Sequence, residues 1–192
     1  MSNYFKHDNA LVESDDIGEG TRVWAFVHIM KNSIVGKNCN IRDHCFIESG
    51  AVIGNEVTIK NGVSVWDSVI IEDSVFLGPN VTLTNDLLPR SRNDQWKAVA
   101  TTIRRGASIG ANATIICGVE IGEYSMVGAG SVVSHSISPY TLVFGNPAEF
   151  KAFICQCTNK LVFDNKEEAI CSNCRKEYIM KSGIVKYASI NK

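Results

Sequence analysis

Aliphatic residues recur at every sixth position over most of the chain. Isoleucine, valine or leucine fills twelve consecutive positions of this series, from Ile17 to Leu83. A small or β-branched residue stands four positions after each of the first eleven, from Thr21 to Val81. Because side chains two residues apart on a strand face the same side, the two series point inward together. The pattern predicts a short strand in every six residues, with a turn between successive strands.

Glycines mark many of these turns. Gly18, Gly36, Gly54 and Gly78 directly follow an aliphatic residue of the series. Glycine adopts positive φ at little steric cost, so we expect corners with positive φ at these four positions.

The phase of the repeat breaks once. It stops after Leu83, restarts at Ile103 and then continues at the same spacing through Val133. Because the twenty residues from Leu83 to Ile103 are not a multiple of six, the segment between them must leave the repeat and rejoin it. We therefore predict a projecting loop over residues 84–102.

A unit of six residues cannot bury its apolar side alone, so successive units must stack on one another. An amphipathic helix is the alternative, but its apolar residues would recur with a period of 3.6 rather than six. The sequence predicts an all-β chain that winds into a solenoid of parallel strands. At three strands per coil, the eighteen aliphatic positions give about six coils.

The repeat, its interrupting loop and the closing segment GNPAEFKA, residues 145–152, resemble the left-handed parallel β-helix acyltransferases. The resemblance covers residues 15–152. It implies left-handed coils of triangular section, a homotrimer, and acyl-CoA bound between neighbouring subunits. We expect residues 1–152 to form this acyltransferase domain and residues 153–192 to form a separate cysteine-rich tail.

Four cysteines in two pairs define the tail. They are Cys155, Cys157, Cys171 and Cys174. Thiolates from two closely spaced turns can hold Zn²⁺ tetrahedrally, and four sulfur ligands leave no position for a substrate water. We predict a structural zinc site in a zinc-ribbon-like appendage, with four free thiols in a small hairpin as the alternative.

The other three of the seven cysteines have simpler interpretations. Cys39 and Cys45 fall on inward positions as small hydrophobic residues, and Cys117, two residues after Ile115, is expected on the outer surface. No secretion signal precedes them, which favours reduced thiols or a metal over disulfides.

Residues eighteen apart should lie on the same outward row of successive coils, about 5 Å apart. One row contains Lys31, Ser49, Asp67 and Asn85, which places the Asp67 carboxylate beside the amide that opens the loop. A loop above stacked polar residues is a favourable place for a site. The alternative is that Asp67 and Asn85 are ordinary solvated residues.

Two segments, residues 57–69 and 78–91, resemble the nucleotide-sugar N-acetyltransferases more narrowly. The positions that carry this likeness are Trp66, Asp67, Asn85, Asp86, Pro89, Arg90 and Ser91. They are similar to those of enzymes that acetylate the 3-amino group of dTDP-3-amino-3,6-dideoxyhexoses for surface polysaccharides. Close relatives act on UDP-2-acetamido-3-amino-2,3-dideoxyglucuronate, so this sugar remains an alternative acceptor.

The implied reaction is attack of a neutral sugar amine on the thioester of acetyl-CoA, assisted mainly by proximity. As a hypothesis, Asp67 accepts a hydrogen bond from the amine, Asn85 orients the nucleophile or the acyl oxygen, and the CoA thiolate takes the proton. In related xenobiotic acetyltransferases a histidine base follows the asparagine, and Asp86 stands in that place here. This leaves His28 and His44 as candidate imidazole bases or ligand hydrogen-bonders.

The remaining candidates would bind phosphates or the cofactor. Arg90, and Arg42 with Lys60 eighteen residues later, can pair with the nucleotide pyrophosphate, although solvated surface cations are the alternative. The resemblance implies that backbone groups near the last coils bind acetyl-CoA and that a nearby cation meets its phosphates. These candidates are Gly128, Ala129, Ser131, Arg104 and Lys151.

Charge and composition exclude several classes of function. Nineteen Lys and Arg against 20 Asp and Glu give a net charge of −1, so no overall positive field attracts nucleic acid. No run of eighteen apolar residues is present, and we expect a cytoplasmic protein without membrane insertion. The four scattered histidines do not favour a γ-type carbonic anhydrase. A non-catalytic hexapeptide-repeat binding module is the remaining alternative.

Overall fold

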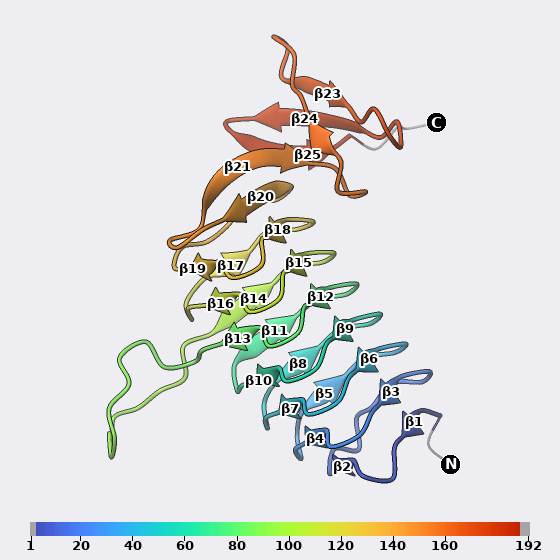
Figure 1. The fold of residues 1–192 in the computed structure, drawn as a ribbon, viewed down its shortest axis with the longest axis vertical. Helices are drawn as coiled ribbons and strands as arrows, with labels where there is room; N and C mark the ends of the chain where they lie inside the picture. The colour runs from blue at the N-terminus through green and yellow to red at the C-terminus, as the bar shows by residue number, and fades with distance from the viewer. Residues whose placement is uncertain (1–2, 189–192) are drawn as a thin grey trace.

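The computed structural model describes residues 3–188, and the regular structure in that range is entirely β-strand. Most of the chain winds into a column of short parallel strands that rises from the N-terminal end (Figure 1). Three stacks of strands, which we call sheets A, B and C, form its sides, and successive strands occupy them in turn. The predicted all-β solenoid is confirmed, and its stacking is consistent with a left-handed β-helix.

Sheet A contains β1 (Phe5–Lys6), β3 (Arg22–Val23), β6 (Asn40–Ile41), β9 (Thr58–Ile59), β12 (Phe76–Leu77), β15 (Ser108–Ile109), β18 (Met126–Val127), β20 (Thr141–Phe144), β21 (Glu149–Ile154) and β22 (Lys160–Leu161). Sheet B contains β2 (Leu11–Val12), β4 (His28–Ile29), β7 (Phe46–Ile47), β10 (Ser64–Val65), β13 (Thr82–Leu83), β16 (Thr114–Ile115) and β19 (Val132–Val133). Sheet C contains β5 (Ile34–Val35), β8 (Val52–Ile53), β11 (Val69–Ile71), β14 (Thr101–Ile103) and β17 (Glu120–Ile121). A separate sheet D contains β23 (Glu168–Ile170), β24 (Glu177–Lys181) and β25 (Ile184–Tyr187).

From β3 up to the loop, strands of neighbouring coils pair in parallel with a register of eighteen residues. Phe46 pairs with Ser64 in sheet B, and Ile34 pairs with Val52 in sheet C. Residues eighteen apart therefore share an outward row, as the repeat predicted. Because each coil holds the next one in a fixed register, the rows show which side chains of neighbouring coils lie side by side in a candidate site.

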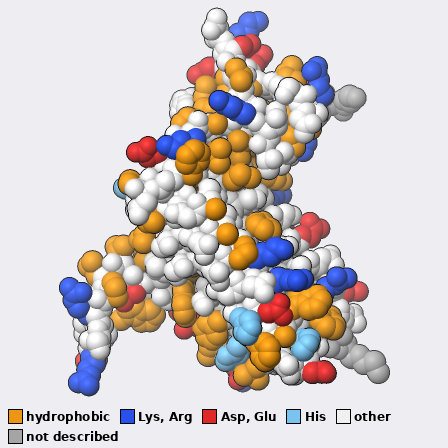
Figure 2. Space-filling view, in the orientation of Figure 1, with side chains coloured by type: hydrophobic (Ala, Val, Ile, Leu, Met, Phe, Trp, Pro, Cys, Tyr) orange, Lys and Arg blue, Asp and Glu red, His pale blue; other side chains and the backbone are white. Residues whose placement is uncertain are grey.

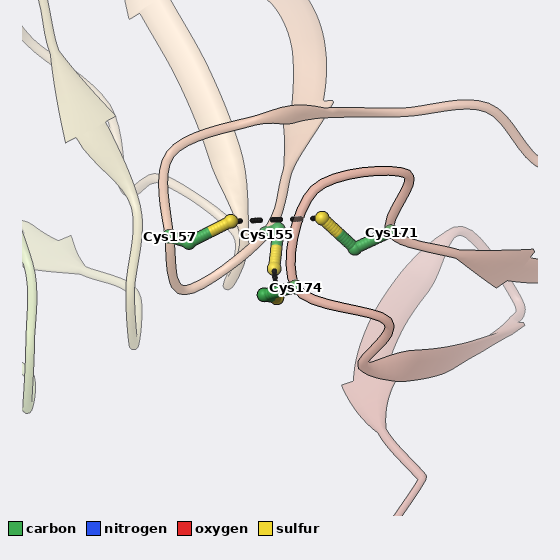
Figure 3. Close-up of side chains that lie close together, drawn as sticks. All are labelled: Cys155, Cys157, Cys171 and Cys174. Carbon is green, nitrogen blue, oxygen red and sulfur yellow. Dashed lines mark hydrogen bonds between the residues drawn. The ribbon is translucent and has the colours of Figure 1, made fainter.

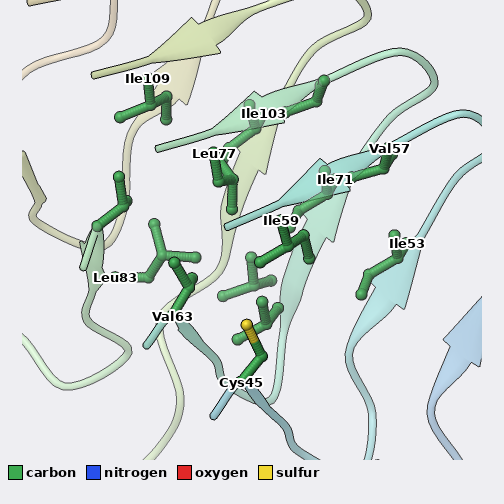
Figure 4. Close-up of a cluster of buried hydrophobic side chains, with 14 of the residues drawn as sticks. Cys45, Ile53, Val57, Ile59, Val63, Ile71, Leu77, Leu83, Ile103 and Ile109 are labelled. Carbon is green, nitrogen blue, oxygen red and sulfur yellow. The ribbon is translucent and has the colours of Figure 1, made fainter. Parts of the chain in front are cut away.

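The interior of the column is one continuous apolar core. Both inward series are buried in it, including Val57, Ile59 and Val63 with no exposed surface, and Cys45 with 1% (Figure 4). Cys39 is buried at its inward position as well. Burial of apolar surface stabilises a fold by about 25 cal/mol per Å², and here every coil makes a similar contribution.

The solenoid extends further at both ends than the repeat indicates. Sheet A holds eight parallel strands, from β1 to β20, whereas about six coils were expected. At the start, the pairing has a spacing of seventeen, so Lys6 lies opposite Val23, where the later coils hold an aliphatic residue. At the end, Val143 pairs with Val127 at a spacing of sixteen. Hydrogen bonding to the neighbouring coil continues although the sequence pattern has lapsed.

The expectation for the four glycines was wrong. Positive φ occurs two residues later, as at Gly20 and Asn38, directly before an inward residue. Gly36 is instead required by close packing between coils, because a Cβ atom there would lie 2.5 Å from the carbonyl carbon of Gly54. Gly18 and Gly54 likewise lie against the backbone of the next coil.

The projecting loop runs between β13 and β14, over residues 84–100, and extends away from the column (Figure 1). It is two residues shorter than predicted because Thr101 and Thr102 already pair with Val69 and Ile70 of the coil below. Thr101 is buried as an inward residue of the resumed repeat.

The tail continues from the solenoid through sheet A. β21 spans residue 152, where we expected the division, and pairs antiparallel with both β20 and β22. Sheet D follows β22, and a second small core forms in which Leu161 of β22, Cys171 and Tyr178 are buried. No helix capable of crossing a membrane occurs within residues 3–188.

Candidate functional site

The turn from sheet B to sheet C, which we call the loop corner, brings the main candidates together. Trp66 and Asp67 form it after β10, and Thr84 and Asn85 form it one coil later, at the base of the loop. Pairing of Ser64 with Thr82 sets this alignment. The loop corner therefore presents a carboxylate and an amide at equivalent positions of neighbouring coils.

Asp67 is held by the coil below it. The backbone N–H of Asp67 donates to the Glu48 carboxylate over 2.8 Å, and Ser68 Oγ donates to the Asp67 carboxylate over 3.4 Å. The carboxylate packs so closely over Gly50 that any side chain there would overlap it. Asp67 remains partly exposed. These contacts fix an accessible carboxylate at the loop corner.

Trp66 connects the two coils of the loop corner. Its indole N–H donates to the Leu83 carbonyl over 2.7 Å, and its ring lies 5.7 Å from the ring of Phe46. The polar atom of Trp66 is therefore occupied by the protein. Its geometry suits positioning of the strand that leads to Asn85.

The two ends of the loop are tied together at this corner. Val99 N–H donates to the Asn85 carbonyl over 2.9 Å, and Cys117 N–H donates to Thr84 Oγ1 over 2.9 Å. Asp86 accepts a hydrogen bond from Leu88 N–H, so it shapes the first turn of the loop.

The outer part of the loop is exposed. Arg90 donates to the Pro89 carbonyl over 3.1 Å, and its side chain and that of Ser91 face solvent. Leu88 is 77% exposed and Trp96 is 44% exposed. Basic side chains are visible at the end of the loop in the space-filling view (Figure 2).

Cys117 does not lie on the outer surface, where we expected it. It is 4% exposed and follows β16 at the loop corner, where both ends of the loop meet the column. Its N–H donates to Thr84 Oγ1 where the loop departs, and the N–H of the next residue, Gly118, donates to the Ala100 carbonyl where the loop returns. Six-residue periodicity assigns outward positions correctly only where nothing from another part of the chain lies over them.

The histidine and phosphate-binding candidates occupy a different region. Arg42, His44 and Lys60 lie at the turn from sheet A to sheet B, which we call the A–B corner. His28 lies on sheet B between the two corners, with its Nε2 2.9 Å from Glu13 and its ring 5.4 Å from that of Phe46. The structure therefore brings none of these residues to the loop corner itself.

The candidate cofactor residues are divided between two regions. The turn from β18 to β19 contains Gly128, Ala129 and Ser131. Gly128 packs against Phe144, and the Lys151 ammonium lies 5.0 Å from the centre of the Phe144 ring. The Ser131 hydroxyl is buried and donates to the Gly128 carbonyl over 2.7 Å. Its side chain is therefore committed to the turn, which leaves backbone groups to meet a ligand.

Arg104 stands apart from the other cofactor candidates. Its guanidinium donates to Glu72 over 2.7 Å and to Glu120 over 2.5 Å, beside sheet C. The hydrogen bond to Glu120, and to a smaller extent the one to Glu72, raises the pKa of the Arg104 guanidinium. Two carboxylates thus already neutralise this cation, which makes it a weak partner for a phosphate.

The four tail thiols converge on one point. All four Sγ atoms lie within 4.8 Å of one another, with Cys155 3.3 Å from Cys174 and Cys157 3.5 Å from Cys171 (Figure 3). A tetrahedral zinc with Zn–S bonds of about 2.3 Å holds its sulfurs about 3.8 Å apart. The donor set and its geometry therefore fit a zinc ion.

The environment of these thiols differs across the cluster. The backbone N–H of Asn159, followed by the side chain of Asn173, lowers the pKa of Cys157 to about 6. Burial raises the pKa of Cys155 to about 12. A metal ion would have to overcome this cost by direct coordination, which deprotonates bound thiols.

Comparison with known proteins places these features in a family. The sequence model of the family described as bacterial transferase hexapeptide (six repeats) matches residues 16–49, 50–85 and 100–135 of this chain. This chain belongs to the hexapeptide transferases. The matched segments omit residues 86–99, in agreement with a loop inserted into the repeat of this hexapeptide transferase.

A curated relative extends the likeness over almost the whole chain. The dTDP-3-amino-3,6-dideoxy-α-D-galactopyranose 3-N-acetyltransferase of Aneurinibacillus thermoaerophilus is 56% identical over 182 residues, covering 94% of this hexapeptide transferase and 93% of the relative. The resemblance to nucleotide-sugar N-acetyltransferases found in the sequence is thus confirmed.

A solved structure shares the fold. The acetyltransferase domain of PglB from Neisseria gonorrhoeae, in complex with acetyl coenzyme A, matches with a TM-score of 0.53 and 19% identity. The match covers 78% of this hexapeptide transferase and 58% of that chain.

Sequence reasoning overlooked Glu48 and Gly50, which hold and accommodate Asp67. Glu48 lies eighteen residues before Trp66, so the same row reading, applied one position earlier, would have found it.

Proposed function

We propose that this hexapeptide transferase is an N-acetyltransferase that moves the acetyl group of acetyl-CoA to the 3-amino group of a dTDP-3-amino-3,6-dideoxyhexose. The observation that carries the proposal is the 56% identity, over 94% of the chain, to an enzyme of that name. The galacto-configured sugar in that name is the first choice of acceptor. The fixed carboxylate of Asp67 beneath the loop is an independent support.

The chemistry requires a neutral amine near the thioester carbonyl. Asp67 accepts a hydrogen bond from the amine, and Asn85 orients the amine or the acyl oxygen. The amine nitrogen forms a bond to the carbonyl carbon, the C–S bond breaks, and the amine proton passes to the departing CoA thiolate. Placing the reactants together supplies much of the rate. No protein group needs to be a strong base.

We place the cofactor along the upper coils of a homotrimer. Gly128 and Ala129 offer backbone groups there, and Lys151 offers the nearest cation among the candidates. The outward row of Ile34, Val52 and Ile70 on sheet C presents an apolar strip, which a neighbouring copy can cover. The exposed Leu88 of the loop adds a second apolar contact.

In the tail, we assign a structural Zn²⁺ to the four thiols of Cys155, Cys157, Cys171 and Cys174. The ion would supply no reaction chemistry, because four sulfur ligands complete its coordination. Its role is to join the turn after β21 to the turn after β23.

The reaction is tested by release of CoA from acetyl-CoA. Acceptors are dTDP-3-amino-3,6-dideoxygalactose, its gluco epimer and UDP-2-acetamido-3-amino-2,3-dideoxyglucuronate, with a reaction lacking acceptor to subtract the protein's own thiols. We expect turnover with a dTDP sugar. Turnover confined to the glucuronate would replace the substrate, and acetyl-CoA binding without any turnover would contradict the proposed acceptor class.

Asp67→Asn tests the role of the carboxylate. The variant keeps the shape but loses the charge that attracts and aligns the amine, so we expect kcat to fall about 100-fold. Asp15→Asn makes the same change at an exposed position three coils below Asp67 and should leave kcat unchanged. Full kcat and KM in Asp67→Asn would remove Asp67 from the mechanism.

A further inference from the structure

Two stacked aromatic pairs occupy the same strained position in the turns of the solenoid. Phe26 and His44 have φ of 59° and 60°, and Tyr124 and Tyr140 have φ of 52° and 57°. Glu56, Ser68 and Ser74 also stand at such turn positions, but most of the others hold glycine or asparagine, which tolerate positive φ. These include Gly20, Asn38, Gly62, Asn80, Asn112 and Gly130. Bulky residues rarely adopt this conformation, so something must favour a ring at these four positions.

The tyrosine pair has a visible reason. Its rings stack 5.6 Å apart, and Tyr140 also packs against Tyr178 of the tail at 5.3 Å. Gln156 of the tail donates to the Tyr140 hydroxyl, and Tyr140 is only 3% exposed. This stack forms the surface on which the tail lies.

The Phe26–His44 pair has the same geometry without such a cover. Its rings are 4.9 Å apart and nearly parallel, at 12°, yet Phe26 is 57% exposed. An exposed flat stack in a strained backbone is suited to a planar ring from a ligand. By comparison with the tyrosine pair, the Phe26–His44 stack offers an uncovered flat surface on which a ligand ring could pack.

The chemistry beside the stack is cationic. The guanidinium of Arg42 lies 4.8 Å from the ring centre of Trp24, and its buried Nε has no hydrogen-bond partner within the described part of the chain. Lys60 stands eighteen residues after Arg42, in the same row. Asp43, the nearby carboxylate, already accepts a hydrogen bond from Asn61. In Figure 2, Lys, Arg and His side chains gather over these N-terminal coils together with apolar side chains and with Asp or Glu.

We propose that the A–B corner binds the nucleoside diphosphate part of the acceptor, with the base stacked on Phe26 and His44 and the diphosphate near Arg42 and Lys60. The inference rests on the proposed function for its nucleotide-linked acceptor. It adds Phe26, which the sequence analysis had not selected, as the residue that holds the base.

The path from this corner to the loop corner supports the assignment. β7 begins two residues after His44, and its Phe46 contacts Trp66, the neighbour of Asp67. The base, the diphosphate and the amino sugar would therefore run from one corner of sheet B to the next. Coenzyme A also contains a base and a diphosphate, but its candidate residues, Gly128 and Lys151, lie at the other end of the column.

Phe26→Gly tests the stack without straining the turn, because Gly62 occupies the same position in a later coil. Titration calorimetry on the full chain, with dTDP and CoA as separate probes, should show at least tenfold weaker dTDP binding and unchanged CoA binding. Phe26→Tyr should restore dTDP binding. Asn80→Gly is the matched control, since it alters the same turn position in a coil without an aromatic stack.

Three results would overturn the inference. These are unchanged dTDP affinity in Phe26→Gly, loss of CoA affinity instead of dTDP affinity, and an equal loss in Asn80→Gly. Steady-state kinetics distinguish a failure of this inference from a failure of the proposed function. Wild-type turnover of a dTDP sugar establishes the function, and Phe26→Gly should then raise the KM for the sugar at least tenfold with kcat within twofold. An unchanged KM would reject the stack while leaving the reaction intact.

Discussion

The solenoid and the cysteine-rich tail are stabilised in different ways, although sheet A runs through both. In the solenoid, each coil buries aliphatic residues against the next, as Ile41, Ile59 and Leu77 do in sheet A. The tail has a small core around Tyr178 and brings four thiols together. A repeat distributes stability along the chain, whereas a small unit needs a cross-link or metal to offset its lost conformational entropy.

Removal of the metal should separate the two regions most clearly. We expect one zinc per chain in the wild type and none in Cys171→Ser, which removes one ligand of the four. Without the ion the tail should unfold, because metal binding and folding of such units are coupled. Limited proteolysis should then cut between residues 155 and 188, while the solenoid resists and keeps its circular dichroism.

Cys45→Ala is the control for loss of a buried thiol. Cys45 lies in the solenoid core, so its removal should leave the zinc content and the protease resistance of the tail unchanged. If Cys171→Ser retained both zinc and a protected tail, the tail would be stabilised by its apolar core alone.

A cavity made in the core of either region should show whether the loss of stability stays within that region or spreads to the other. Ile59→Ala removes a fully buried side chain at the middle of the column and should cost about 2–5 kcal/mol of global stability in urea. Leu161→Ala, in the tail core, should increase hydrogen exchange in residues 155–188 and leave exchange in the solenoid unchanged.

Thr58→Ala, on the outward face of the same strand as Ile59, should change stability by less than about 0.5 kcal/mol. A loss from Leu161→Ala that spread equally over the solenoid would mean that the two regions unfold as one unit.

The sequence predicted the periodic part of the molecule better than the contacts between distant segments. The inward series, the row that joins Asp67 to Asn85, and the grouping of the tail cysteines all follow from spacing. The burial of Cys117 does not, because Cys117 lies where the two ends of the inserted loop meet the column. The commitment of Arg104 to Glu72 and Glu120 likewise depends on which coils become neighbours after that insertion.

The strained aromatic turns also escaped the sequence analysis. Spacing places Phe26 and His44 in turns, but only the backbone shows that both have positive φ and that their rings stack. The glycines were misinterpreted for a related reason. Spacing places these glycines in turns correctly. It does not show that the backbone of the next coil lies against them and leaves no room for a Cβ atom.

Two substitutions separate the two reasons for glycine in the solenoid. Gly36→Ala would place a Cβ against the backbone of the next coil, and we expect a loss of about 3 kcal/mol because rigid backbone must move. Gly130→Ala meets no atom within 4 Å but has a φ of 69°, so it should cost only about 1 kcal/mol. Urea unfolding of both variants measures the difference. Equal losses would mean that turn conformation, rather than the separation of coils, determines where the repeat requires glycine.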